Sequence, residues 1–193
     1  MQIIEIENAI PPLYQDQVEL EATSNDIPWY FHRETARAGA GFGVQHSGFS
    51  HLAYHHREPV SSGMGPSLIP MLFMFCDKAK LPLKSILRIR VGLFVKGSDE
   101  VLHHNPHIDF LVPHYTAVYY VHDSDGDTFI FNETSDQVPQ AEAPRYAAER
   151  GFSIAKRCSP KKGKMICFDG KHYHASMHPI VSEARIAITF NFQ

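Results

Sequence analysis

The residues of this sequence best suited to chemistry are His107 and Asp109, two positions apart in the segment His-His-Asn-Pro-His-Ile-Asp. On a β-strand, residues two apart point to the same face, so we expect the imidazole and the carboxylate to lie side by side. Together they would supply two ligands of a facial triad, in which two histidines and one carboxylate bind Fe(II). The third ligand is expected from a distant strand, and the candidate is His174 near the end of the chain. His-x-Asp alone arises often by chance, so the surrounding residues must show whether it belongs to a metal site.

A calcium site is one alternative use of the acidic residues. Asp123, Asp125 and Asp127 have the spacing that begins an EF-hand loop. Such a loop needs glycine at its sixth position and glutamate at its twelfth, where this chain has Thr128 and Thr134. The pattern therefore favours a polar turn over a calcium site.

A zinc-peptidase site is the alternative use of the histidines. That site requires the pattern His-Glu-x-x-His on a helix. The segment from His104 to His107 reads His-Asn-Pro-His, which has no glutamate and contains a proline. The sequence therefore excludes this interpretation for the segment.

Arg185 is the candidate partner for an organic co-substrate at an iron site. A dicarboxylate such as 2-oxoglutarate would chelate the metal at one end, and the planar fork of an arginine matches the carboxylate at the other. The residues after Arg185 are mostly apolar, so a buried position is expected, and a buried arginine needs an anionic partner. Thr189 would share its strand face and add a hydroxyl group. If Arg185 does not serve, Arg88 and Arg90 are the alternatives.

Two structural regions are expected to position these residues. The first contains helices and loops, and the second contains most of the strands, with residues 123–127 as the turn of a hairpin. Such an order is typical of a sandwich or jelly roll with helices packed on one sheet. The predicted strands are 3–6, 29–32 (an aromatic core strand), 85–95, 116–121, 128–131, 152–156, 164–168 and 185–192; the predicted helices are 12–22, 66–81 and 141–150, and 36–62 is predicted to be a long loop.

Composition indicates an ordinary globular protein. The chain has 193 residues, 44% of them hydrophobic and 20% charged, which predicts one domain over residues 1–193, with a helical and loop support region at 1–84 and a β core at 85–193. The net charge of −3 gives no reason to expect a nucleic-acid partner. No apolar run is long enough for a membrane span and no secretory signal is visible, so we expect a cytoplasmic protein whose three cysteines are reduced.

Residues 87–192 resemble the 2-oxoglutarate- and Fe(II)-dependent oxygenases, in particular the prolyl 4-hydroxylase-like branch with its small bacterial and phage-encoded members. The resemblance rests on His107-x-Asp109, on Val-Tyr-Tyr-Val (118–121) before an acidic turn, on Gly-Lys-Met-Ile-Cys-Phe (163–168) leading to His174, and on Arg185-x-x-x-Thr189. It implies a mainly β protein with supporting helices, folded as a double-stranded β-helix (a jelly roll, cupin-like).

The resemblance also implies roles for individual residues. His107, Asp109 and His174 match the catalytic iron ligands, while Tyr119, Arg185 and Thr189 match positions that bind the far carboxylate of 2-oxoglutarate. Many relatives have a tyrosine on the strand before His-x-Asp, where this chain has Leu-Phe-Val (93–95), so that contact is missing or supplied elsewhere. Arg185 follows His174 by eleven positions, which is toward the upper end of the spacing usual in the family.

The implied activity is that of a dioxygenase that uses Fe(II), O2 and 2-oxoglutarate to hydroxylate a C–H bond. The carboxylate of Asp109 favours hydroxylation over the halogenation carried out by relatives with a small residue at this position. A prolyl residue of a peptide or protein is the first substrate expected, and a free amino acid or other small metabolite the next. A non-catalytic jelly-roll protein that binds a metal structurally is the alternative from another class.

The chain has 13 histidines, so the third ligand has rivals. His172 would share the strand face of His174, which we prefer because His-Ala-x-x-x-Pro, ending at Pro179, matches the family. His103, His104 and His178 have no assigned role, although proximity to the triad favours contact of His103 and His104 with a substrate.

Overall fold

Two antiparallel sheets form the framework of this protein in a computed structural model, which describes residues 2–35, 47–55, 58–59, 62–98 and 102–193. The large sheet has the strand order β1 (Ile4–Ile6), β9 (Met165–Asp169), β6 (Tyr115–Tyr120), β11 (Ala184–Phe192), β5 (Ile86–Val95), β3 (Gly48–His55) and β2 (Tyr30–His32), and β4 (Glu58–Pro59) pairs with β3. The small sheet has the order β10 (His172–Ser176), β7 (Thr128–Thr134) and β8 (Ile154–Cys158). The helices are α1 (Pro12–Ala22), α2 (Gly65–Ala79) and α3 (Ala143–Glu149).

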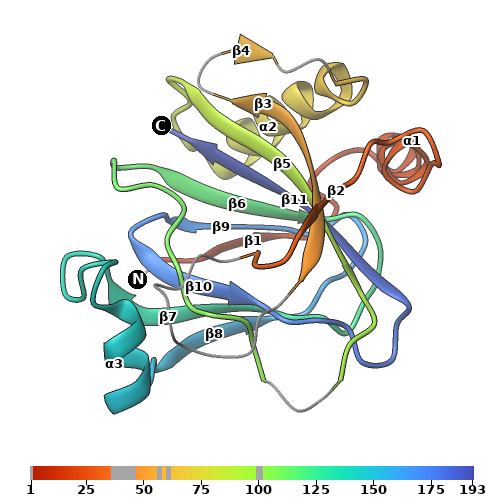
Figure 1. Cartoon of the computed structure of the whole chain (residues 1–193). Helices are drawn as coiled ribbons and strands as arrows, with labels where there is room; N and C mark the ends of the chain where they lie inside the picture. Colours follow the sequence, from red (N-terminus) through yellow and green to blue (C-terminus); the bar gives the residue numbers. More distant parts are fainter. Residues whose placement is uncertain (1, 36–46, 56–57, 60–61, 99–101) are drawn as a thin grey trace.

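The elements are stacked in layers (Figure 1). Buried side chains of α1 and α2 pack against the outer face of the large sheet, as Phe75 does near Ile89 and Phe190. A second cluster, which includes Val118, lies between the two sheets. A third joins α3 to the outer face of the small sheet through residues such as Phe131. The predicted mainly β architecture with helices on a sheet is therefore confirmed.

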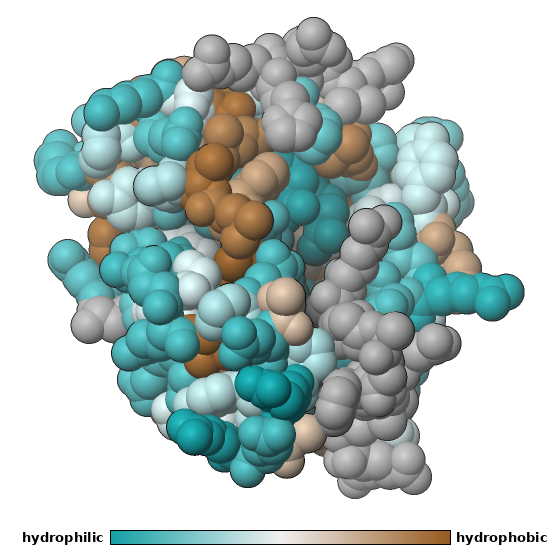
Figure 2. All heavy atoms as spheres, turned by 60° about the vertical axis from the view of Figure 1, so that its left-hand side comes forward, coloured by the Kyte–Doolittle hydropathy of each residue, from teal (hydrophilic) through white to brown (hydrophobic). Residues whose placement is uncertain are grey.

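The space between the sheets becomes the candidate site because β5 and β11 alternate. Along β11, Ile186, Ile188, Phe190 and Phe192 pack into the helix-covered core, while Arg185 and the residues two and four positions on face a pocket on the other side. This is the period of two that a strand imposes on its side chains. A surface view of one face shows hydrophobic residues bordering a hollow near its middle (Figure 2).

Most of the predicted elements are confirmed with small shifts at their ends. They are α1, α2, α3, β1, β5, β6, β7, β8, β9 and β11. Helix α3 is followed by Gly151 at φ 74°, the left-handed conformation in which glycine costs least. Strand β10 (His172–Ser176) is absent from the predicted strand ranges, but it places His174 on a strand, as expected for the third candidate ligand.

The first 84 residues contribute more than helices and loops, because β1, β2 and β3 all extend the large sheet. The long loop predicted at 36–62 is wrong over Gly48–His55, where β3 pairs with β5; residues 36–46 lie outside the described residues. This strand could not be recognised from the sequence, because buried His51 and half-buried Ser50 interrupt its apolar pattern. The aromatic strand is β2, but Tyr30 and Phe31 are 64% and 58% exposed, so it is an edge strand and not a core strand.

The predicted hairpin at 123–127 is also wrong. Strand β6 pairs with β9 and β11 in the large sheet, whereas β7 pairs with β10 and β8 in the small one, so the turn carries the chain across the sandwich. Its aspartates bind protein groups: Asp123 accepts from the Lys162 N–H, and Asp127 pairs with Arg157. Asp125 accepts hydrogen bonds of 2.8, 2.8 and 2.9 Å from the N–H groups of residues 180–182.

Two smaller findings concern the cysteines and the helices. Cys76, Cys158 and Cys167 are all free and buried. Burial raises the pKa of Cys76 and Cys158 to about 11, which keeps these thiols protonated at neutral pH. Among the described residues, no helix combines the length and hydrophobicity that a membrane crossing requires.

Asp125→Asn is expected to lower the free energy of unfolding at pH 7 by about 1 kcal/mol, because the three N–H groups lose a charged acceptor. Partial burial would raise the pKa of Asp125, but the backbone hydrogen bonds outweigh it and hold the pKa well below its usual value. A depressed folded-state pKa gives stability that is present above the unfolded-state value, about 3.9, and is lost as the pH falls below it.

The difference in unfolding free energy between the wild type and Asp125→Asn, measured by denaturant titration, should therefore become smaller below about pH 4. Asp26→Asn, at an exposed position, is the matched control. Equal stabilities of the wild type and Asp125→Asn at pH 7 would contradict this role.

Candidate metal centre and co-substrate pocket

The structure brings His107, Asp109 and His174 together, although they come from distant parts of the chain. One ligand atom of each lies within 4.8 Å of those of the other two, which is the separation that a single metal ion can span. His174 is on β10, whereas His107 forms only an isolated β-bridge with it, through backbone hydrogen bonds of 3.0 Å in both directions. The expectation of a regular strand at 107–109 is thus wrong, and a single bridge aligns the two imidazoles.

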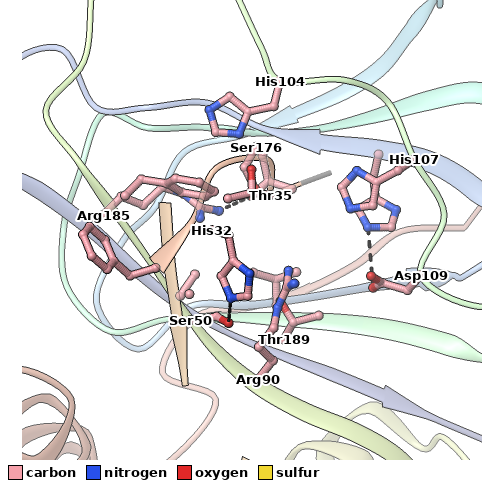
Figure 3. A pocket seen from close by; sticks show the side chains of 17 residues that line it. His32, Thr35, Ser50, Arg90, His104, His107, Asp109, Ser176, Arg185 and Thr189 are labelled. Atoms are coloured by element: carbon pink, nitrogen blue, oxygen red, sulfur yellow. Dashed lines mark hydrogen bonds and ion pairs between the residues drawn. The ribbon is translucent and has the colours of Figure 1, made fainter. Parts of the chain in front are cut away.

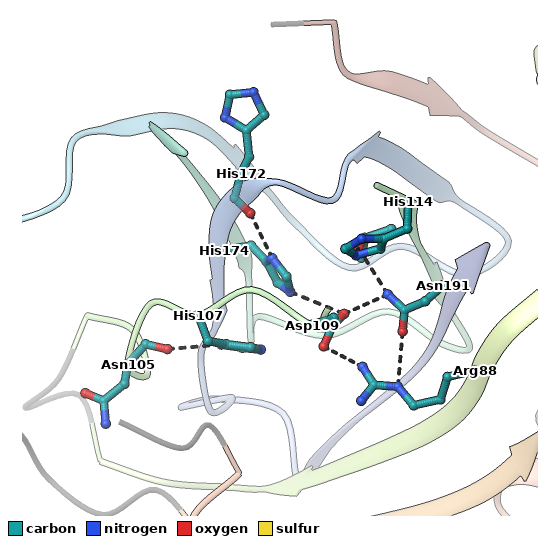
Figure 4. Close-up of polar contacts among 9 residues, drawn as sticks. Arg88, Asn105, His107, Asp109, His114, His172, His174 and Asn191 are labelled. Atoms are coloured by element: carbon teal, nitrogen blue, oxygen red, sulfur yellow. Dashed lines mark hydrogen bonds and ion pairs between the residues drawn. The ribbon is translucent and has the colours of Figure 1, made fainter. Parts of the chain in front are cut away.

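Backbone carbonyls orient both imidazoles (Figure 4). The Nδ1 atom of His107 lies 3.1 Å from the Asn105 carbonyl oxygen, and that of His174 lies 3.2 Å from the His172 carbonyl oxygen. A carbonyl can only accept, so each Nδ1 carries a proton, and in the neutral form of such a ring Nε2 keeps its lone pair. This second hydrogen bond is how proteins commonly fix the tautomer of a metal-binding histidine.

The carboxylate of Asp109 is held by two partners from the large sheet (Figure 4). Arg88 on β5 forms an ion pair with Oδ1, and the Asn191 amide on β11 donates to Oδ2 at 2.8 Å. Arg88 also donates to the Asn191 side-chain oxygen at 3.1 Å, and Asn191 donates to Thr116 at 3.1 Å. This network fixes the carboxylate, and neither Arg88 nor Asn191 was assigned to it from the sequence.

The charges of the triad suit a divalent cation. Burial would raise the pKa of Asp109, but Arg88 and the two histidines outweigh it and hold the pKa well below the usual range. Burial, with a smaller contribution from His174, lowers the pKa of His107 to about 3. At neutral pH the site therefore presents a carboxylate and a neutral imidazole at His107, and the donor set fits Fe(II).

His172 does not compete for the third position. The register of β10 against β7 shifts between His172 and His174, which marks a bulge or irregularity. A bulge redirects side chains, so residues two apart need not share a face. The His172 ring lies near the Phe131 carbonyl oxygen, at 3.1 Å, and points away from the triad (Figure 4). The preference for His174 agrees with this geometry.

Arg185 lies in the same pocket as the triad, toward its other end (Figure 3). Its side chain is 2% exposed; Nε donates to the Gly126 carbonyl at 2.6 Å and Nη2 donates to the Thr128 hydroxyl at 2.9 Å. The guanidinium also lies over the rings of Phe94 and Tyr120, each at 5.8 Å. Both hydrogen-bond acceptors are neutral, and no carboxylate of the described residues forms an ion pair with it. The Arg185 guanidinium therefore still lacks the anionic partner that its burial leads us to expect.

Two residues expected beside Arg185 lie elsewhere. Tyr119 is fully buried in the helix-side core, on the other face of the sheet, where burial and the acidic residues of α1 raise the pKa of its hydroxyl. Its assignment to the co-substrate is corrected, because an odd position on β6 cannot share a face with Val118 and Tyr120. Thr189 does line the pocket, but it pairs with Arg90, about 13 Å of strand from Arg185. Thr128 provides the hydroxyl beside Arg185.

The other histidines differ in their distance from the pocket. His104 lines it, and its ring packs on Phe94 and His178 at centroid distances of 4.6 and 4.5 Å. The His103 ring instead contacts Phe129 and Phe131 of the small sheet. His32, which no motif indicated, lines the pocket from β2 because the sheet brings this edge strand over it.

Comparisons with known proteins give a match only at the level of structure. No protein-family model matches the sequence, and no curated protein does. An oxidoreductase of the 2OG-Fe(II) oxygenase family from Burkholderia pseudomallei aligns with a TM-score of 0.68 at 13% identity, over 99% of this chain and 84% of that one. This chain has the fold of the 2-oxoglutarate- and Fe(II)-dependent oxygenases. The likeness confirms the predicted jelly roll.

Two further solved structures show the range of this fold. A Pseudomonas putida prolyl-4-hydroxylase aligns with a TM-score of 0.61 at 12% identity, over 99% of this chain and 91% of that one. The epimerase SnoN from its complex with Fe3+, α-ketoglutarate and nogalamycin RO aligns with a TM-score of 0.56 at 13% identity, over 99% and 78% of the two chains. Proteins of different stated activities thus share this architecture.

Asn191→Ala is expected to weaken divalent-metal affinity about 10-fold, because the Asp109 carboxylate loses one of the partners that orient it. Isothermal titration of the apo-protein with Mn(II) as the probe would measure this. Asn132→Ala, at an exposed asparagine on β7, is the matched control and should bind as the wild type does. Unchanged affinity in Asn191→Ala would show that Arg88 alone orients the carboxylate.

Proposed function

We propose that this protein is an Fe(II)- and 2-oxoglutarate-dependent dioxygenase that hydroxylates a C–H bond. The observation that carries the proposal is the content of one pocket: a His-Asp-His triad and, at the other end, a buried arginine with no anionic partner among the described residues. A dicarboxylate that chelates a metal with one end would satisfy both features at once. The shared fold supports the proposal.

The strands between the two ends form a suitable floor. Gly92 on β5 and Ala187 on β11 are a cross-strand pair that lies between the Arg90–Thr189 pair and the Phe94–Arg185 pair. Both line the pocket, and a Cβ atom added to Gly92 would meet only the Ala187 carbonyl, at 3.8 Å. Small side chains here leave room for the carbon chain of the co-substrate.

Each part of the chain then has a defined task. His107, Asp109 and His174 would hold Fe(II), which supplies the activation of O2 when it is bound, with 2-oxoglutarate as the co-substrate that is oxidised. Arg185 and Thr128 would bind the far carboxylate of 2-oxoglutarate, and Arg88 and Asn191 would keep the Asp109 carboxylate in place. The apolar cluster between the sheets lowers the local dielectric constant, which would strengthen these electrostatic contacts.

The substrate candidates are a prolyl residue of a peptide or protein and a free amino acid or other small metabolite. The first is supported by the likeness to a prolyl-4-hydroxylase, and the second by the likeness to SnoN, whose complex contains a small molecule.

Asp109→Ala is expected to abolish the joint binding of Fe(II) and 2-oxoglutarate, since the triad loses its only carboxylate. Anaerobic titration of the apo-protein with Fe(II) and 2-oxoglutarate, followed by the visible metal-to-ligand charge-transfer band, measures this chelation. The wild type should give the band, and so should Asp169→Ala, the control at an exposed aspartate on β9. If the wild type bound metal without a band, the non-catalytic binding protein would become the better interpretation.

Arg185→Met is expected to raise the dissociation constant for 2-oxoglutarate about 10- to 100-fold, because a charge-assisted bidentate contact is lost. Metal affinity should change little, since Arg185 lies at the other end of the pocket. The same titration measures both quantities, and Arg145→Met, at an exposed arginine on α3, is the control. Thermal unfolding of each variant separates a loss of affinity from a loss of the fold. Unchanged affinity for 2-oxoglutarate would place the carboxylate anchor elsewhere.

A further inference from the structure

The pocket contains another cationic side chain, Arg90, which is not needed to bind 2-oxoglutarate in the proposed function. Arg90 projects from β5 into the pocket, opposite Thr189 on β11 and Leu52 on β3. Its Nε atom is shielded from solvent and has no hydrogen-bond partner within the part of the chain that the structure describes. No carboxylate of those residues forms an ion pair with it. Its neighbour Arg88, two positions earlier on the same face, is by contrast paired with Asp109.

The neighbours of the Arg90 guanidinium show where it lies in the pocket. Burial lowers the pKa of His32 and the charge of Arg90 lowers it further, so the two side chains are neighbours, as Figure 3 shows. Arg90 also shares its strand face with Arg88, the partner of Asp109 in the triad. The acidic group that acts on it is Asp109, which Arg88 and Asn191 already engage. A half-buried guanidinium keeps its charge, so this position favours a further anion.

Polar groups beside Arg90 extend this part of the pocket. The His32 ring and the Ser50 hydroxyl are 2.7 Å apart, and both line the pocket from β2 and β3. Figure 3 shows Arg90, His32 and Ser50 in the space between Arg185 and the triad. The three side chains offer a planar fork of donors, an imidazole and a hydroxyl group, a set that matches a carboxylate.

We propose that Arg90, with His32 and Ser50 beside it, binds the carboxylate of the substrate. The inference rests on the proposed function, in which Arg185 and the metal account for the two ends of 2-oxoglutarate and leave Arg90 for a different molecule. It names the substrate class as a small carboxylic acid, such as a free amino acid. An internal prolyl residue has no carboxylate of its own and would leave Arg90 half-buried without an ion pair from the described residues, a costly arrangement.

The test uses the full-length protein, labelled with [15N]arginine and loaded with Zn(II) and saturating 2-oxoglutarate, so that Arg185 is occupied and no turnover takes place. Arg90→Met and Arg185→Met assign the two Nε–H resonances. Acetate, the smallest suitable carboxylate, is then titrated as the probe; acetamide is its neutral counterpart, and chloride controls for ionic strength. The resonance of exposed Arg145 is the internal control.

The expected result is a saturable shift of the Arg90 resonance with acetate and none with acetamide or chloride, while Arg145 does not respond. An Arg90 resonance that ignores acetate would overturn the proposal. So would an Arg90 resonance that shifts when 2-oxoglutarate binds and not afterwards, because Arg90 would then belong to the co-substrate. Failure of Zn(II) and 2-oxoglutarate to shift the Arg185 resonance would instead refute the proposed function, and the inference with it.

Arg90→Met provides a second measurement. Its affinity for 2-oxoglutarate, read from the charge-transfer titration with Fe(II), should stay close to that of the wild type, whereas Arg185→Met loses about 10- to 100-fold. A comparable loss in Arg90→Met, with thermal unfolding unchanged, would assign Arg90 to the co-substrate and overturn the proposal.

Discussion

The fixed carboxylate of Asp109 is the interaction on which the candidate site depends. It ties the irregular segment that carries His107 to two neighbouring strands of the large sheet, through Arg88 and Asn191. These two partners and the His174 Nε2 atom, 3.6 Å from Oδ2, give the carboxylate one position, and the bridge between His107 and His174 then sets the imidazoles around it. An irregular segment can thus hold ligands accurately, because regular strands supply its partners.

A surplus of positive charge between the two sheets is the second feature that defines the pocket. Arg88 is neutralised by Asp109, whereas Arg90 and Arg185 face the same pocket without an ion pair among the described residues. Keeping such charges between two sheets costs free energy, and the chain offsets part of that cost with neutral acceptors and aromatic rings around Arg185. Bound anionic ligands would offset the rest of this cost. Ligand binding in the proposed function would therefore also stabilise the folded protein.

The alternation of side chains explains how one sheet can serve two purposes. On β5 and β11 the odd and even positions separate the apolar core under α1 and α2 from the lining of the pocket. The irregularity in β10 interrupts the same rule and separates His172 from His174. The regular period and its interruption together bring His107, Asp109 and His174 together as candidate ligands and turn His172 away from them.

The sequence by itself determined the candidate ligands, the buried arginine and most of the elements. His-x-Asp, the distal histidine and an arginine among apolar residues are local patterns, and alternation or helical period depends on neighbouring residues alone. The tertiary structure decided which residues meet. It placed Tyr119 on the far face, put Thr128 in place of Thr189 beside Arg185, sent the 123–127 turn across the sandwich, and brought His32 and Arg90 into the pocket. The reason is that strand pairing joins segments distant along the chain, and their register follows from packing over the whole core.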